Sequence, residues 1–428
     1  MLKRKYLKFC FELIFILIII VGGLKVLEKG KYSPGLEPDE FAWIFTGYYF
    51  DLYFLRFDLF HQDWKDYEAF DQPPLAKYIV GGALFLRGYR IDSLDVKRFW
   101  NSVPVDKLPT YFDLVKDKIP NLSVIIHSLR STIFLFALSS LLIIYIFVRI
   151  LYGALPAFVS TSLIISNPIH NYYSIRVLAD PILLLFFTLF ILLCALYLKL
   201  QKNIYLVLAF IVSSLAFLTK LNGILLVFML ITIFLIKNKF SISKQDWKFV
   251  ITGFIAFLLI TMLLNPVFLN TGIKAIGKMV EVRLSAFRTF QETFKGVALL
   301  SVSERFATAT QMIFFSYSPF YNVIKIPVEL IMFVVGFYYI FRRRDLLLMT
   351  IFAFLVVIPI SILPHNTPRY YYWIFPFTHI IAGLSINLFK EMLSRQDVRF
   401  LKIQDKCPNL SRFMGKLFSK AERNNSPM

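Results

Sequence analysis

The sequence predicts an all-α polytopic membrane protein with about ten transmembrane helices (10–13), and three observations support this fold class. First, 57% of the 428 residues are hydrophobic and only 17% are charged, whereas about a quarter of a soluble domain is charged. Second, the apolar residues form long blocks, several of which reach the roughly 20 residues that a helix needs to cross the hydrocarbon core. Third, Lys and Arg gather between these blocks. A transmembrane β-barrel would instead show short segments of alternating hydrophobicity.

The predicted spans follow the apolar blocks in chain order. They cover residues 9–27, 128–149, 153–170, 179–199, 203–218, 221–237, 249–269, 323–341, 346–363 and 372–390. We interpret the first block as a retained helix, because no small-residue cleavage site follows it. Segment 306–321 is apolar but short and interrupted by polar residues, which favours a re-entrant or interfacial segment.

Basic clusters predict the orientation. They occur at the N-terminus, at 199–202, 237–248 and 342–344 and in the tail, and such clusters mark the cytoplasmic side. Both termini are then cytoplasmic. We expect a transmembrane domain over 1–392, with outer loops at 28–127 and 270–322, and a short basic cytoplasmic tail over 393–428. This pattern accounts for the net charge of +20, and no soluble basic domain suggests nucleic-acid binding.

Cysteine usage indicates neither a disulfide framework nor a zinc site. Cys10, Cys194 and Cys407 lie far apart in the sequence, without the spacing of metal ligands.

The acidic stretch Glu-Pro-Asp-Glu at 37–40 is unusual so soon after an apolar span. Pro38 and Asp39 are suited to begin a helix, where the helix dipole favours acids. A partly desolvated carboxylate at a membrane surface is also a candidate base for an alcohol. Both interpretations are compatible, and they make Asp39 and Glu40 candidate catalytic residues.

Two further acidic motifs belong to the same predicted outer face. In the stretch FDQPPLAKY at 70–78, Asp71 can cap a helix opened by the prolines, or contact a substrate, while Lys77 can extend toward the interface. In RVLADP at 176–181, Asp180 can serve as a helix N-cap before Pro181, and Arg176, one turn earlier, can pair with it.

Cationic side chains on this predicted outer face need a negatively charged partner. Lys220 lies between two apolar blocks, and Arg369 precedes the last span. Lipid headgroup binding explains them, and so does a dedicated phosphate site. An aromatic belt accounts for Tyr370 and its neighbours but not for His365.

These motifs together resemble the C-type membrane glycosyltransferases, most closely the group of dolichyl-phosphate-mannose–protein mannosyltransferases and aminoarabinose lipid A transferases. The matching stretches are Asp39-Glu40, Asp71 to Lys77, Arg176 to Pro181, Leu218 to Lys220, and Arg369-Tyr370. The similarity of layout covers roughly residues 9 to 390. The sequence departs from the group in having fewer spans than many members and no large soluble C-terminal domain, which leaves the acceptor open.

The resemblance implies transfer of a sugar from a polyprenyl-phosphate donor in the membrane lipid to a hydroxyl of a protein (Ser or Thr), lipid or glycan, with inversion. Asp39, with Glu40, would act on the acceptor hydroxyl, and Lys220 and Arg369 would hold the donor phosphate. The substrate-binding residues would be Asp71, Lys77, Arg176, Asp180, His365 and Tyr370. The active site would then lie on the extracytoplasmic face of the plasma (inner) membrane.

Two alternatives remain at the level of the sequence. The sequence identifies no definite cofactor, and a divalent cation is the alternative. The resemblance implies a metal held by Asp71 and Asp180 with Glu40 as one choice, and His61, Asp63 and Asp71 could instead form an oxygen-rich site. A membrane transporter, or a lipid-linked sugar flippase or ligase, is the alternative function. The sequence of a transporter would place charged residues near the middle of spans and would often contain inverted repeats, and this sequence shows neither.

Overall fold

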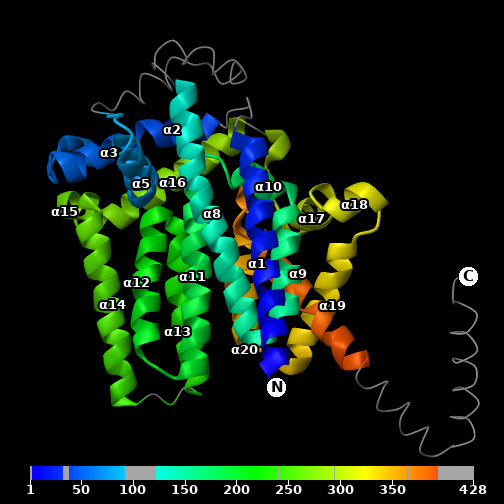
Figure 1. The fold of residues 1–428 in the computed structure, drawn as a ribbon. Helices are drawn as coiled ribbons and strands as arrows, with labels where there is room; N and C mark the ends of the chain where they lie inside the picture. Colours follow the sequence, from blue (N-terminus) through cyan, green and yellow to red (C-terminus); the bar gives the residue numbers. More distant parts are fainter. Residues whose placement is uncertain are drawn as a thin grey trace, which may run out of the picture.

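The computed structural model describes residues 2–31, 38–91, 122–239, 241, 243–293, 295–363 and 366–393. These residues form an α-helical bundle with a layer of shorter helices across one end (Figure 1). The all-α part of the predicted fold class is therefore confirmed.

Four helices among the described residues are long and apolar enough to cross a membrane. They are α1 (Leu2–Lys31), α8 (Leu122–Tyr152), α11 (Ala179–Leu200) and α14 (Lys244–Leu264). Each overlaps a predicted span, but α14 begins and ends five residues before the predicted 249–269, whose last residues lie in α15 (Pro266–Thr271). In the most apolar window of α1 and of α14, only 11% and 17% of the residues are buried, against 67% in α11. α11 therefore lies inside the bundle, where it packs against α8 and α12, and α1 and α14 expose apolar side chains on its outside.

The other predicted spans overlap shorter or broken helices, so the part of the chain that the structure describes does not contain ten full-length spans. They correspond to α9 (Ala154–Ser166) with α10 (Pro168–Tyr173), α12 (Ile204–Thr219), η4 (Leu221–Ile224) with α13 (Leu225–Lys237), α19 (Val328–Arg343), α20 (Leu346–Phe352) with η7 (Ala353–Val357) and α21 (Ile358–Ile362), and α22 (Phe375–Gly383). The break between α9 and α10 has a local cause. Pro168 lacks the N–H that would continue the helix, and the side chain of Asn167 instead accepts a hydrogen bond from Ile169 N–H at 2.8 Å.

Two segments build the layer at the end of the bundle, and all of their residues except 266–269 were predicted to lie in the outer loops. We call residues 38–91 and 266–293 the cap layer, and the end of the bundle that it covers the cap end. The layer contains α2 (Pro38–Phe45), α3 (Tyr48–Phe50), η1 (Asp51–Leu55), η2 (Gln62–Lys65), α4 (Tyr67–Asp71), α5 (Leu75–Phe85), α15 (Pro266–Thr271) and α16 (Lys274–Thr293). Figure 1 shows these elements lying across the ends of the long helices.

The cap layer has its own hydrophobic core and is attached to the bundle by hydrogen bonds. Buried aromatic rings form much of that core, including those of Tyr49 and Trp64, whose centroids lie 4.9 Å apart. The hydroxyls of Tyr53 and Tyr78 donate to the carbonyls of Leu263 (2.8 Å) and Leu264 (3.1 Å). These carbonyls lie at the C-terminus of α14, where a helix leaves its own acceptors without partners. The aromatic residues thus fix the layer to α14.

The segment after the cap layer contains η5 (Lys295–Val297), α17 (Val302–Gln311), η6 (Met312–Ser316) and α18 (Pro319–Ile324). No helix of spanning length occurs there, and the predicted 306–321 segment falls within these short elements. η8 (Pro368–Tyr371) precedes α22. Because α11 begins beside Lys220 and α12 ends at it, the basic turn at 199–202 lies at the end of the bundle opposite the cap.

Candidate active site

A cavity of about 620 Å³ lies between the cap layer and the ends of the bundle helices. It is lined by Asp39, Ala42, Trp43, Thr46, Tyr67, Glu68, Asp71, Gln72, Lys77, Lys220, Arg283, Ala286, Arg369 and Tyr370. Seven of these fourteen lining residues are charged, and both signs occur among them. Their side chains come from α2, α4, α5, α16, the end of α12 and η8, so the fold assembles the site from distant parts of the chain.

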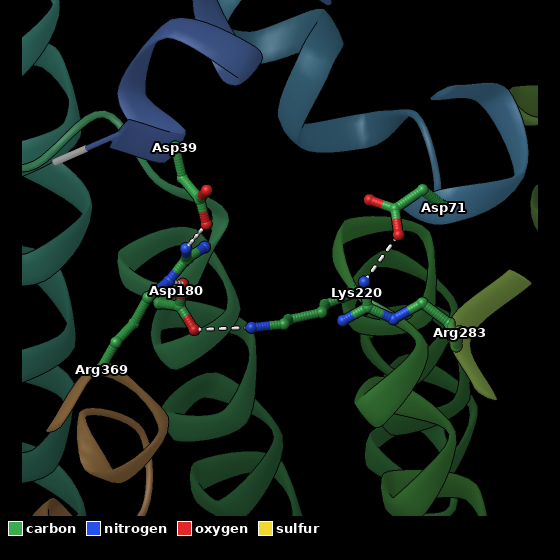
Figure 2. A network of polar contacts seen from close by, with 6 residues as sticks. All are labelled: Asp39, Asp71, Asp180, Lys220, Arg283 and Arg369. Carbon is green, nitrogen blue, oxygen red and sulfur yellow. Dashed lines mark hydrogen bonds and ion pairs between the residues drawn. The ribbon is translucent and has the colours of Figure 1, made fainter. Parts of the chain in front are cut away.

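A chain of alternating charges crosses one wall of the cavity (Figure 2). Lys220 Nζ donates to Asp180 Oδ1 at 2.8 Å, and Arg369 Nε donates to Asp180 Oδ2 at 2.9 Å. Arg369 also pairs with the carboxylate of Asp39. Two cations and two carboxylates therefore balance each other here, and a new anion would have to compete for Lys220 and Arg369.

Asp39 and Asp180 occupy the first turns of their helices. Asp39 follows Pro38 at the start of α2, and its side chain is 47% exposed. Asp180 is fully buried, and Leu178, not Asp180, is the N-cap of α11. The expected capping role of Asp180 is therefore wrong, because its carboxylate turns toward Lys220 and Arg369.

The backbone positions Lys220 at the abrupt end of α12. Lys220 is extended (φ −158°, ψ 142°), and η4 follows directly. Gly223 packs so closely on the backbone of Ala216 that any side chain there would overlap it. The Lys220 ammonium also lies 5.6 Å from the centroid of the Tyr370 ring, at a distance that allows a cation–π contact.

The opposite wall carries a second ion pair, shown in Figure 2. Arg283 Nη1 of α16 donates to Asp71 Oδ1 at 2.7 Å. Asp71 ends α4 and does not cap α5, whose N-cap is Pro74. The capping alternative for Asp71 is thus wrong.

Lys77 is buried beside this pair and does not extend toward an interface as one interpretation expected. Its ammonium donates to the carbonyl of Gln72 at 2.6 Å and to that of Glu68. α5 belongs to the cap layer and not to the four spanning helices. Burial lowers the pKa of Lys77 to about 8, and the carboxylates of Asp71 and Glu68 only partly oppose this effect. A basic group that titrates near neutral pH is common at functional sites.

Glu40 faces away from the cavity, although it adjoins Asp39 in the sequence. Successive helical residues point about 100° apart, so the two carboxylates have different surroundings. Glu40 is fully buried and accepts from Arg130 Nε (3.0 Å), Arg130 Nη2 (2.7 Å) and the N–H of Val177 (2.9 Å). Arg176 Nη1 lies 3.4 Å from it. The expected pairing of Arg176 with Asp180 is therefore wrong, since Arg176 pairs with Glu40.

The structure brings six of the ten predicted site residues into the cavity lining. These are Asp39, Asp71, Lys77, Lys220, Arg369 and Tyr370. Asp180 lies directly behind Lys220 and Arg369, while Glu40 and Arg176 form a separate buried cluster. His365 lies outside the described residues.

Sequence reasoning missed Arg130 and Arg283. Arg130 is a charge at the edge of an apolar block, which is an expensive position and a signal that it has a function or a partner. Arg283 is one of several basic residues on an amphipathic helix, and nothing in its local sequence distinguishes it.

Among the described residues, no group of three or more His, Cys, Asp or Glu side chains could hold a metal ion. His61 lies near Asp63 (3.3 Å), whereas Asp71 pairs with Arg283 and Asp180 with two cations. Neither set of ligands considered from the sequence is assembled.

Comparisons with known proteins agree with the fold and with the resemblance noted from the motifs. A family model described as dolichyl-phosphate-mannose-protein mannosyltransferase matches residues 123–264, which run from α8 to the end of α14. No curated protein matches the sequence.

Solved structures of C-type glycosyltransferases share the fold. ArnT from Cupriavidus metallidurans, bound to undecaprenyl phosphate, matches with a TM-score of 0.53 and 14% identity, over 88% of this chain and 60% of that one. The apo form of ArnT matches with a TM-score of 0.52 and 15% identity, over 88% of this chain and 59% of that one. The archaeal oligosaccharyltransferase AglB from Archaeoglobus fulgidus, in complex with an inhibitory peptide and a dolichol-phosphate, matches with a TM-score of 0.54 and 12% identity. The match covers 91% of this chain and 52% of that one. This chain thus spans between half and two thirds of the length of these proteins.

Proposed function

We propose that this protein transfers a sugar from a polyprenyl-phosphate donor to a hydroxyl of a protein, lipid or glycan acceptor. The reaction takes place at the cap end, on the extracytoplasmic face of the plasma (inner) membrane, with both termini in the cytoplasm. One observation carries the proposal: the cavity at the end of the bundle places an exposed carboxylate, Asp39, beside the cations Arg369 and Lys220. A lipid-phosphate donor needs cations, and a hydroxyl acceptor needs a base. ArnT and AglB, which share the fold, are complexed with lipid phosphates.

Donor binding would exchange partners within the charge chain. The donor phosphate approaches Lys220 and Arg369, and it competes with Asp39 for the Arg369 guanidinium. Asp180 is fully buried and bonded to both cations, so it keeps them in place during this exchange. Asp39 is then released from its ion pair. Because a nearby cation favours the charged form of a carboxylate, this release makes Asp39 a better proton acceptor.

The chemical step then proceeds by in-line displacement. The acceptor oxygen forms a bond to the anomeric carbon while the bond from that carbon to the phosphate oxygen breaks. The configuration inverts, the acceptor proton passes to Asp39, and polyprenyl phosphate leaves as a monoester. Lys220 and Arg369 stabilise the charge that develops on the departing phosphate.

The remaining residues have supporting roles in this proposal. Asp71, Lys77 and Tyr370 line the cavity and would contact sugar or acceptor hydroxyls. Neither Glu40 nor Arg176 lines the cavity. We assign this pair to holding α2, and thereby Asp39, in place. This assignment replaces the direct catalytic and substrate-binding roles expected from the sequence.

The test is sugar transfer by membranes that contain wild-type protein or Asp39→Asn, with a panel of radiolabelled polyprenyl-phosphate sugars. A positioned base contributes about 10²- to 10⁴-fold, or roughly 3–5 kcal/mol, so the variant should lose activity by that factor. Glu292→Gln is the control, because Glu292 is exposed and lies outside the cavity lining. Near-normal turnover by Asp39→Asn would remove Asp39 from the base role, and no transfer by wild type with any donor would favour transport or flipping.

A further inference from the structure

Four large apolar side chains are exposed on the cap layer near the end of α14. Phe57 and Phe60 lie in the loop between η1 and η2, Leu269 lies in α15, and Ile273 directly precedes α16. Their exposed fractions are 72%, 72%, 46% and 84%. We call these four residues the rim. Scattered apolar residues are ordinary on a protein surface, whereas a group of large ones marks an interaction site.

A hydrogen bond joins the two segments of the rim beside α14. Asn270, which follows Leu269, donates from Nδ2 to the carbonyl of Leu59 at 2.7 Å, and Phe60 is the next residue. α15 begins two residues after α14 ends, and Figure 1 shows it at the cap end of that helix. The rim therefore lies next to the end of a helix that has an exposed apolar surface.

The loop between η1 and η2 holds Phe57 on a fixed backbone. Phe57 has a φ of +53°, in the left-handed region that is uncommon for a bulky residue. The N–H of Asp58 donates to the carbonyl of Leu52 at 3.0 Å, and the carbonyl of Asp58 accepts from Trp64 Nε1 at 2.9 Å. Trp64 is fully buried. These bonds anchor the loop to the core of the cap layer and leave the Phe57 ring exposed.

The length of α14 indicates what covers the rim. α14 exposes Leu259 and Leu263 near its cap end. Its uncharged part runs over residues 249–264, and these 16 residues rise about 24 Å at 1.5 Å each. The hydrocarbon core of a bilayer is about 30 Å thick. About 6 Å of hydrocarbon would therefore extend past the end of α14, and side chains at that level would meet acyl chains.

The residues around the rim suit the edge of the hydrocarbon better than its centre. Asp58 lies between the two phenylalanines, and Lys274 follows Ile273. A lysine can keep its stem against an apolar surface while its ammonium remains among the headgroups. Apolar faces with Phe and Leu beside charged residues are typical of segments that lie in the interface plane.

We propose that the rim inserts into the bilayer at the cap end, at the boundary between headgroups and acyl chains. There it lengthens the apolar belt of α14 and supports the cap layer from the lipid side. The partner is the lipid bilayer, and the property that the rim matches is the thickness of its hydrocarbon. The proposal does not depend on sugar transfer.

The first experiment measures how deeply single fluorophores lie in the bilayer. Full-length protein is reconstituted in phosphatidylcholine bilayers, with Cys10 and Cys407 replaced by Ser, while Cys194 is buried and remains. Nitroxide-labelled lipids quench labels within the bilayer, and iodide quenches labels in water.

The labels are attached at Phe60→Cys and, separately, at Ile273→Cys. Leu263→Cys on α14 is the lipid-facing reference, and Lys65→Cys is the control at an exposed charged position of the cap layer. We expect both rim labels to lie about 5–10 Å inside the boundary region and the Lys65 label to lie outside the lipid. Iodide quenching of both rim labels to the same extent as the Lys65 label would overturn the proposal. Pyrene at the same cysteines tests a second copy of the chain, because excimer emission without quenching by lipid would also overturn it.

A second experiment varies the bilayer thickness and needs no label. Phe60→Ser/Ile273→Ser removes two rim side chains, and Gln62→Ser/Lys65→Ser is the matched control at two exposed polar positions. The rim variant should melt at a lower apparent temperature than wild type in dioleoylphosphatidylcholine. It should match wild type in the thinner dimyristoleoylphosphatidylcholine, because hydrocarbon there no longer extends past α14. Equal losses in both lipids, or the same loss in the control, would contradict insertion of the rim.

Discussion

The adjacent carboxylates Asp39 and Glu40 should respond very differently to neutralisation, and Glu40→Gln is the more informative change. The Glu40 carboxylate is fully buried and receives three hydrogen bonds at 3.0 Å or less, two from Arg130 and one from the Val177 N–H. Gln has almost the same shape as Glu but no charge. Its N–H₂ group would also have to face donors.

The expected loss follows from the burial of both partners. The side chains of Glu40 and Arg130 are 0% and 1% exposed, so solvent cannot screen the charge that remains. Breaking a buried ion pair by removing one partner destabilises a protein by about 3–5 kcal/mol. We therefore expect Glu40→Gln to lower the free energy of unfolding by about that amount. Asp39→Asn should have a much smaller effect on stability, because the Asp39 side chain is 47% exposed.

The assay is reversible unfolding of the purified protein in mixed micelles, followed by far-ultraviolet circular dichroism as denaturing detergent is added. Wild type, Glu40→Gln and Asp39→Asn are compared under identical conditions. Glu40→Asp keeps the charge and is a useful fourth protein, because it should lose less stability than Glu40→Gln. If Glu40→Gln unfolds at the same point as wild type, the Arg130–Glu40 pair does not stabilise the fold and the positioning role of Glu40 fails.

Three further predictions concern the cavity and the packing of the bundle. Lys220→Met should raise the KM for the lipid donor at least tenfold, because Asp180 would lose one of its two cations and the donor phosphate would lose one of its cationic partners. The KM is measured from initial rates over a range of donor concentration, and an unchanged KM would argue against phosphate binding at Lys220. Burial lowers the pKa of Lys77 to about 8, below its ordinary value, so the unfolded state binds more protons between that pH and about 10.4. Wild type should therefore gain stability relative to Lys77→Met as the pH rises through this window, and parallel pH profiles in thermal denaturation would contradict the burial effect. In Gly336→Ala, the new Cβ would overlap the carbonyl oxygen of Ile381 and separate α19 from α22, so the apparent melting temperature should fall; retention of the wild-type value would show that this helix pair has room to shift.

The broken spans show how far local pattern determines the helices. Composition placed α1, α8, α11 and α14 because each is a long apolar block. It did not show that 153–170 breaks at Asn167–Pro168, although proline supplied the signal. It also did not show that the segment from 346 divides into α20, η7 and α21. Hydropathy reports that a segment is apolar, whereas the hydrogen-bond pattern within it depends on what packs around it.

The pairing of charges was the least predictable part of the candidate site. Local spacing suggested that Arg176 pairs with Asp180 and that Asp39 acts together with Glu40. In the structure Arg176 contacts Glu40, and Asp39 contacts Arg369, which lies 330 residues further along the chain. Arg283, the partner of Asp71, lies 212 residues from it. No local sequence signal links groups at such separations.

The sequence by itself determined that this is a helical membrane protein with acidic and basic residues gathered at the ends of its apolar blocks. Those properties follow from the energy of transfer into lipid, which acts on each segment separately. Only the tertiary structure decided which carboxylate faces the cavity and which is buried with Arg130. It also assembled the cavity between the cap layer and the bundle. Those outcomes depend on desolvation and on contacts between distant segments, and both exist only after the helices have packed.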